Sequence, residues 1–161
     1  MRLHRLAWVA ALLFLVGCDH VTKHVAKTEL ENQPPHNLAA GVVDLRYVEN
    51  TDSAFGLLRW VSPSVRTPLL TAAQLLGGLA FLGLGLRKRV ARSARGALLL
   101  LAGGALGNGI DRLVNGHVID FIHLVHWPVF NLADMYITVG GILLVLAWRR
   151  APPRPFAQLP A

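Results

Sequence analysis

Four long apolar segments alternate with short polar stretches along this 161-residue chain, at about residues 6–26, 68–86, 96–114 and 129–148. A helix of about twenty residues rises roughly 30 Å, which matches the hydrocarbon core of a bilayer. The pattern therefore predicts a mainly α integral membrane protein, with four transmembrane helices in a single domain over residues 1–150.

The connection between the first two segments, at about residues 27–66, follows a different pattern. Apolar Val43, Leu45 and Tyr47 alternate with Asp44 and Arg46, and a two-residue period is typical of a short strand. We therefore expect a small β-structure there, outside the membrane. Residues 115–128 are interpreted as a second outer loop, and the proline-rich end at 151–161 is predicted to be a disordered cytoplasmic tail.

Composition agrees with a membrane protein, because 53% of residues are hydrophobic and only 16% are charged. The net charge of +7 is a feature of nucleic-acid binders as well. However, ten of the sixteen Lys and Arg residues lie in three stretches, at residues 2–5, 87–95 and 149–154. Four spans place all three stretches on one side, which the positive-inside rule assigns to the cytoplasm. We therefore predict a multi-pass bacterial inner-membrane protein with both termini cytoplasmic, and no nucleic-acid partner.

The first apolar segment contains one possible false lead. Residues 15–18, Leu-Val-Gly-Cys, resemble the lipobox of a bacterial lipoprotein signal. A lipid anchor adds little to a chain with three further spans, so we interpret Cys18 as a packing residue. As the only cysteine, it also excludes an internal disulfide.

Polar residues inside the apolar segments are the first functional candidates, because ionisable groups are costly in a membrane. Counted at 1.5 Å per residue, they all fall in the outer third of the bilayer. Asp19 and Lys23 are four residues apart and can pair on one helix face. Gly103 and Gly107 have the spacing that lets membrane helices pack closely. The polar set comprises Asp19, Lys23, Asn108, Asp111, Arg112, Asn131 and Asp134.

Two carboxylates, Asp120 and Asp134, are best placed for chemistry near the outer surface. Neighbouring carboxyl groups that share one proton supply a general base and a general acid for peptide hydrolysis. Alternatively, they cap helices or pair with Arg112, and the residues alone leave both interpretations open. His117, His123 and His126 suggest a metal site, but no HExxH is present. We predict no metal and no cofactor.

These residues fall into five short blocks that resemble motifs of bacterial lipoprotein signal peptidase, also called signal peptidase II, an aspartyl peptidase family (A8). The blocks are D-x-x-T-K at 19–23, N-x-G-x-A-F at 50–55, N-x-x-D-R at 108–112, V-x-D-F at 118–121 and F-N-x-A-D at 130–134. Each block is weak alone. Five in the right order, at matching depths, make the resemblance specific.

The resemblance implies a membrane endopeptidase that cleaves diacylglyceryl-modified prolipoproteins just before the lipidated cysteine, near the outer face of the membrane. It also implies a small extracytoplasmic β-cradle within residues 27–66, contact with membrane lipids and inhibition by globomycin. Asp120 and Asp134 would be catalytic. Residues that bind substrate or support the site would be Asp19, Lys23, Asn50, Asn108, Asp111, Arg112 and Asn131. We expect a monomer.

The chain departs from the family pattern at a few positions. Asp52 replaces the usual glycine of the second block, and Ser53 replaces a common alanine. Met135 and Tyr136 follow the last aspartate, where smaller residues are commoner. None of these changes touches the two aspartates, but each can alter substrate preference or inhibitor fit.

Two other classes of function fit some of these features. In a transporter or proton channel, buried Asp and Arg residues form a relay, but such a pathway would continue inward past the outer third. A non-catalytic binding protein descended from a peptidase is the other class, and the intact aspartate pair argues against it.

Overall fold

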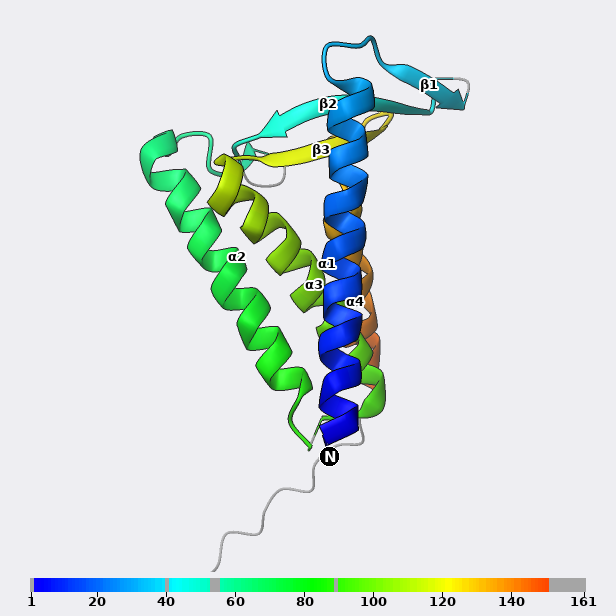
Figure 1. Cartoon of the computed structure of the whole chain (residues 1–161), viewed down its shortest axis with the longest axis vertical. Coiled ribbons are helices and arrows are strands. Elements are labelled where there is room, and N and C mark those ends of the chain that lie inside the picture. The colour runs from blue at the N-terminus through cyan, green and yellow to red at the C-terminus, as the bar shows by residue number, and fades with distance from the viewer. Residues whose placement is uncertain (1, 40, 53–55, 89, 151–161) are drawn as a thin grey trace, which may run out of the picture.

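The computed structural model describes residues 2–39, 41–52, 56–88 and 90–150, so residues 53–55 of the second block and the predicted tail lie outside the described residues. Within these ranges the elements run in the order α1, β1, β2, α2, α3, β3, α4 (Figure 1). The helices are α1 (Arg2–Leu30), α2 (Pro63–Gly85), α3 (Arg92–Asn115) and α4 (Leu132–Arg149). All four are long and apolar enough to cross a membrane, which confirms the predicted fold class.

Three helices are longer than the apolar segments that predicted them. α1 continues to Leu30 because Ala26 and Leu30 are buried against the apolar side chain of Ile119. α2 begins at Pro63, and proline suits a first helical turn because the backbone N–H it lacks has no intrahelical partner there. α3 begins at Arg92 and stops at Gly116, whose φ of 79° is a left-handed conformation that glycine adopts freely.

The sheet contains β1 (His36–Ala39), β2 (Val43–Asn50) and β3 (Val118–Leu124), in the order β1-β2-β3 with antiparallel pairs. The expected strand at 43–47 is present and extends to Asn50. The interpretation of residues 115–128 as a loop is wrong, because they contain β3. Both faces of β3 are covered: Ile119 and Phe121 pack near the end of α1, while Asp120 lines a cavity on the other face. A strand covered on both faces loses the alternation by which it is usually recognised.

α4 begins at Leu132 rather than at the predicted residue 129. The residues before it are taken up by the sheet, because Phe130 exchanges two backbone hydrogen bonds of 2.9 Å with Ile122. Asn131 is then left as the N-cap of α4. This short pairing brings the start of α4 directly beside β3.

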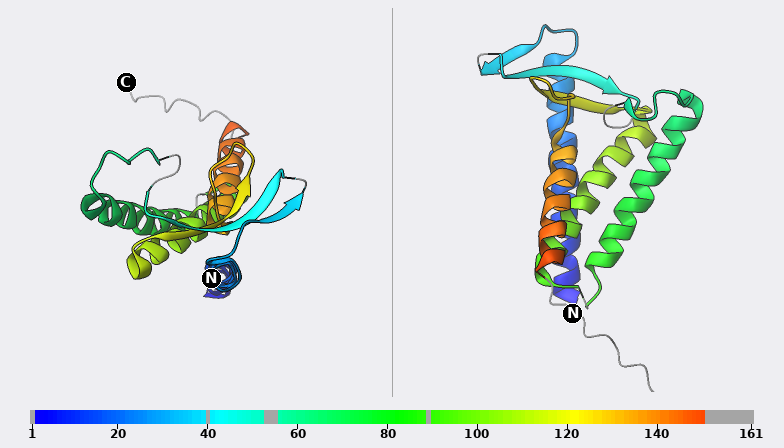
Figure 2. Two further views of the ribbon diagram at one scale, coloured as in Figure 1. Left: turned by 90° about the horizontal axis from the view of Figure 1, so that it is seen from above. Right: turned by 180° about the vertical axis from the view of Figure 1, so that it is seen from behind.

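The sheet covers one end of the helix bundle, and the N-terminus, the α2–α3 connection and the end of α4 lie at the opposite end (Figures 1 and 2). The described parts of the three basic stretches therefore share one end, as four spans require. α2 leans away from α1 toward the sheet end, and among the described elements it packs against α3 alone.

α3 lies at the centre of the bundle, where glycines allow close helix contacts. A Cβ at Gly103 would lie 3.1 Å from Leu15 of α1, and one at Gly107 would lie 2.6 Å from Oδ2 of Asp19. A Cβ at Gly104 would collide with the backbone carbonyl of Ala133 in α4. The close packing predicted from the Gly103/Gly107 spacing is confirmed.

Candidate active site

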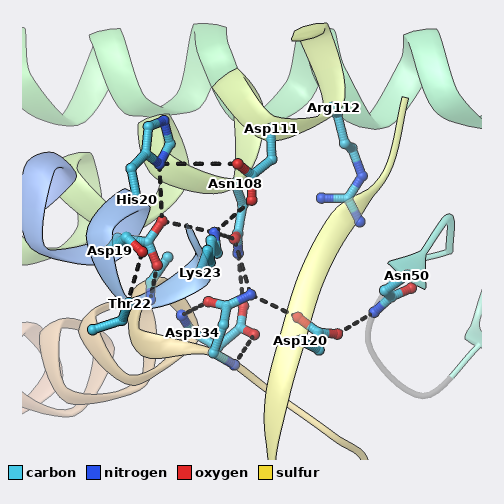
Figure 3. A network of polar contacts seen from close by, with 12 residues as sticks. Asp19, His20, Thr22, Lys23, Asn50, Asn108, Asp111, Arg112, Asp120 and Asp134 are labelled. Carbon is cyan, nitrogen blue, oxygen red and sulfur yellow. Dashed lines mark hydrogen bonds and ion pairs between the residues drawn. The ribbon is translucent and has the colours of Figure 1, made fainter. Parts of the chain in front are cut away.

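A buried lysine joins three partners within the polar network at the sheet end of the bundle (Figure 3). The Nζ of Lys23 lies 2.7 Å from Oδ2 of Asp19, one turn earlier in α1, and 2.7 Å from Oδ2 of Asp111 in α3. It also donates a 2.8 Å hydrogen bond to Oδ1 of Asn108. Lys23 is only 2% exposed, so these three partners take the place of water around its charge. The i,i+4 pair expected from the sequence is therefore part of a link between α1 and α3.

Asn108 connects Lys23 to the start of α4. Its Oδ1 accepts from Lys23 and also from Nδ2 of Asn131, at 3.1 Å. A cation on the oxygen leaves the amide nitrogen as the end that faces the other way. That nitrogen donates a 2.8 Å hydrogen bond to Oδ1 of Asp134. Lys23 thus determines which end of the Asn108 amide meets the carboxylate.

Asp134 also closes the first turn of α4. Its backbone N–H donates to Oδ1 of Asn131 at 3.0 Å, and its Oδ2 accepts from the backbone N–H of Asn131 at 3.2 Å. This reciprocal pair is a capping box, which satisfies backbone donors at a helix start and restricts both side chains. The alternative interpretation of Asp134 as a helix cap is correct for Oδ2, while Oδ1 is held by Asn108.

Asp120 is held between two asparagine amides. Its Oδ1 accepts from Nδ2 of Asn131 at 2.6 Å, and its Oδ2 accepts from Nδ2 of Asn50 at 2.8 Å. Asn50 ends β2 and is paired with Val118 of β3, so the sheet itself sets this contact. Burial, followed by the negative charge of Asp134, raises the pKa of Asp120 to about 6, against the two amide bonds that lower it. Such a carboxyl group can either take up or release a proton close to neutral pH.

Both aspartates line one cavity of about 320 Å³, with walls from α2, α3, α4 and the sheet. Leu70 of α2 and Ile137 of α4 supply part of its apolar lining. Arg112 lines it too, and donates to Oε1 of Gln74 at 2.8 Å and to the backbone carbonyl of Asp52 at 2.6 Å. Among the described residues it forms no ion pair with either aspartate, so the alternative pairing with Arg112 is wrong.

His117 and His123 each have a carboxylate partner in the sheet. Nδ1 of His123 lies 2.9 Å from Oδ2 of Asp44, and Nε2 of His117 lies 3.5 Å from Oε1 of Glu49. In the part of the chain that the structure describes, no three His, Cys, Asp or Glu side chains are grouped closely enough to hold a metal ion.

The family model for signal peptidase (SPase) II matches residues 11–149. This chain belongs to the signal peptidase II family. A lipoprotein signal peptidase of Cyanothece sp. is 41% identical over 96% of this chain and 93% of that one. One of Gloeothece citriformis is 37% identical, covering 98% and 96% of the two chains.

The fold agrees with this membership. A solved bacterial membrane enzyme at 2.3 Å resolution superposes with a TM-score of 0.78 at 26% identity, covering 89% of this chain and 88% of that one. A second, at 1.9 Å resolution, superposes with a TM-score of 0.77 at 24% identity, covering 91% and 94%. The protein is thus a multi-pass membrane peptidase of the signal peptidase II family.

The site residues expected from the sequence all lie at the sheet end of the bundle. Arg112 borders the cavity, and eight form one connected network: Asp19, Lys23, Asn50, Asn108, Asp111, Asp120, Asn131 and Asp134. Sequence reasoning missed Gln74. This residue is the one amide in an apolar segment that has no charged residue, and a single amide in such a segment was the available signal. It also missed Arg66, which is 8% exposed in the first turn of α2.

Proposed function

We propose that this protein is an aspartyl endopeptidase that removes the signal peptide from diacylglyceryl-modified prolipoproteins, cleaving just before the lipidated cysteine. One observation carries the proposal. The carboxyl groups of Asp120 and Asp134 line the same cavity, and each accepts hydrogen bonds from asparagine amides anchored elsewhere in the fold. Membership of the signal peptidase II family supports the peptidase activity and the lipoprotein substrate.

In the proposed reaction the two aspartates share one proton. The ionised carboxylate removes a proton from a water molecule, whose oxygen attacks the carbonyl carbon before the cysteine. The protonated carboxyl stabilises the developing oxyanion and later gives a proton to the leaving nitrogen. The raised pKa of Asp120 fits a carboxyl group that keeps a proton in this cycle. Asn108 and Asn131 hold the two groups so that little reorganisation is needed during the reaction.

We place the site at the outer face of the bacterial inner membrane, with both chain ends cytoplasmic. The described parts of the three basic stretches lie at the end of the bundle opposite the sheet, and cytoplasmic ends of membrane proteins are enriched in Lys and Arg. The site would then meet a lipid-anchored peptide at the depth where its cysteine is held. Contact with membrane lipids, a monomeric state and inhibition by globomycin remain part of the proposal.

The test is hydrolysis of a diacylglyceryl-modified lipobox peptide by the protein in detergent or vesicles. Asp120→Asn and Asp134→Asn are each expected to lower kcat by about 10²–10⁴-fold, the range typical of general acid–base groups. Asp44→Asn is the matched control, because Asp44 is a β2 carboxylate bonded to Arg46 and His123, away from the cavity. Near-normal kcat in both cavity variants would refute the aspartyl mechanism.

A further inference from the structure

An ion pair outside the catalytic network joins the end of β2 to the start of α2. Nη1 of Arg66 lies 3.1 Å from Oδ2 of Asp52, and Nη2 of Arg66 lies 3.4 Å from Oγ1 of Thr51. The Arg66 side chain is 9% exposed and that of Asp52 is 20% exposed. The N-x-G-x-A-F motif that residues 50–55 resemble has glycine at the position of Asp52. The ion pair therefore depends on a carboxylate that the family motif does not provide.

The backbone of Asp52 is tied to the site from two sides. Its N–H donates a 2.9 Å hydrogen bond to Oδ1 of Asn50, which leaves Nδ2 of Asn50 directed at Asp120. Its carbonyl accepts the 2.6 Å bond from Nη2 of Arg112. A shift of Asp52 would therefore change the amide that holds one of the two aspartates, as well as the arginine that borders the cavity.

α2 needs such an attachment more than the other helices do. Among the described elements it packs against α3 alone, yet its residues Leu70 and Gln74 form one wall of the cavity. Arg66 precedes Leu70 by four residues, so both lie on the same face of α2. The contact of Arg66 with Asp52 therefore ties this wall to the sheet as well as to α3.

We propose that Asp52 and Arg66 are positioning residues for the peptidase reaction, whose ion pair holds the outer end of α2 against β2 and keeps the Asn50 amide on Asp120. This inference rests on the proposed function. Neither residue lines the cavity, so both act through others: Arg66 through the α2 wall, and Asp52 through Asn50 and Arg112.

Two measurable effects follow from loss of the pair. A loosened α2 wall weakens substrate binding, which raises KM more than it lowers kcat. A loosened Asn50 amide weakens a hydrogen bond that lowers the pKa of Asp120. The other charges that act on Asp120 are Asp134, Lys23 and Arg112. Arg112 is held by the Asp52 carbonyl, and an Arg112 that moves away from Asp120 would raise the pKa of Asp120 as well. The limb of the pH–rate profile that reports the ionisation of Asp120 should therefore move to higher pH, by roughly half a unit.

The experiment is a double-mutant cycle of Asp52→Asn, Arg66→Met and both together, with the diacylglyceryl-modified peptide as substrate. Each single variant is expected to lower kcat/KM by about 5- to 30-fold, mainly through KM, and to shift the profile upward. The double variant should be little worse than either single one, because the pair is already broken. Arg66→Lys keeps the charge and should recover most of the activity. Arg46→Met breaks a matched β2 ion pair of 2.7 Å outside the cavity and should leave KM and the pH profile unchanged.

The inference would be overturned if the fold-losses of kcat/KM in the two single variants multiplied in the double variant. An unshifted pH profile in both single variants would overturn it as well. Thermal unfolding without substrate is measured for the four proteins of the cycle, which are the wild type, the two single variants and the double variant. This measurement tests the Asp52–Arg66 attachment separately from the proposed function. If the wild type fails to cleave the peptide, the proposed function falls. In that case, coupled losses of unfolding temperature still support the Asp52–Arg66 attachment, and additive losses reject it.

Discussion

Helices α2 and α3 are neighbours of nearly equal length, 23 and 24 residues, and both are apolar enough to cross a membrane. They differ greatly in how the protein surrounds them. About 67% of an 18-residue apolar stretch of α3 is buried inside the protein, against 17% for such a stretch of α2. α3 holds Asn108, Asp111 and Arg112 in its buried part, whereas the buried positions of α2 are Arg66 and two glycines.

The difference teaches that apolar character does not locate the core of this protein. Lipid is as apolar as a protein interior, so large hydrophobic side chains gain little by moving from lipid to a helix contact. Leu69, Leu76 and Leu79 of α2 accordingly remain more than half exposed on the protein surface. Small residues and paired polar residues indicate the packed face instead, and α3 carries both.

Lys23→Met tests the polar side of this comparison and should have the largest effect. The substitution leaves Asp19 and Asp111 buried without their common cation, and breaking a buried ion pair in this way typically costs about 3–5 kcal/mol. The loss is measured as a fall in the thermal unfolding temperature in detergent. Lys27→Met, one turn later on an exposed position of α1, is the control and should change little. Equal stability of the two variants would mean that the network does not hold α1 to α3.

The sequence predicted the features that depend on local spacing. Four long apolar segments predicted the spans, and the Asp19–Lys23 spacing predicted their ion pair. Features that depend on distant partners were not predictable. β3 lacked alternation because the end of α1 covers its second face, and the partner of Arg112 was undetermined until α2 brought Gln74 beside it. The end of α1 and the start of α4 were predicted wrongly for the same reason. Contacts with the sheet extend α1 to Leu30 and move the start of α4 to Leu132.

Gly104→Ala tests the small-residue side of the comparison. The new Cβ would collide with the carbonyl of Ala133 and lie 2.7 Å from Ile137, and a backbone atom cannot yield as a side chain can. Overpacking of this kind costs about 1–3 kcal/mol. We expect a lower unfolding temperature and lower kcat, because α4 carries Asp134. Gly96→Ala in the same helix meets no atom within 4 Å and is the control. If Gly104→Ala is as stable as this control, close packing of α3 against α4 is not required.

A third prediction concerns the pH dependence of stability, to which Asp120 at the sheet end of the molecule contributes. Because the pKa of Asp120 is raised from 3.8 to about 6, the folded protein binds this proton more tightly than the unfolded chain does. Stability should therefore fall as pH rises from about 4 to 6, by an amount on the order of 1–3 kcal/mol, and then level off.

Thermal unfolding between pH 4 and 8 measures this slope, and Asp120→Asn should make it shallower. Asp44→Asn should not, because hydrogen bonds from Arg46 and His123 lower the pKa of Asp44 to about 2. Its contribution is lost only as pH falls below about 4. A slope that is unchanged in the Asp120 variant would assign the titration to another group.

The smallest effect separates the two faces of α2 itself. At Gly83, an exposed position, a Cβ would meet nothing within 4 Å, so Gly83→Ala should stabilise the helix by up to about 1 kcal/mol through its better helix propensity. At Gly78 a Cβ would lie 2.7 Å from Leu106 of α3, so Gly78→Ala should lower the unfolding temperature instead. Opposite signs at two glycines five residues apart would show that α2 has one protein-facing side, with lipid on the other. The same sign at both would mean that α2 is either packed all round or free of α3.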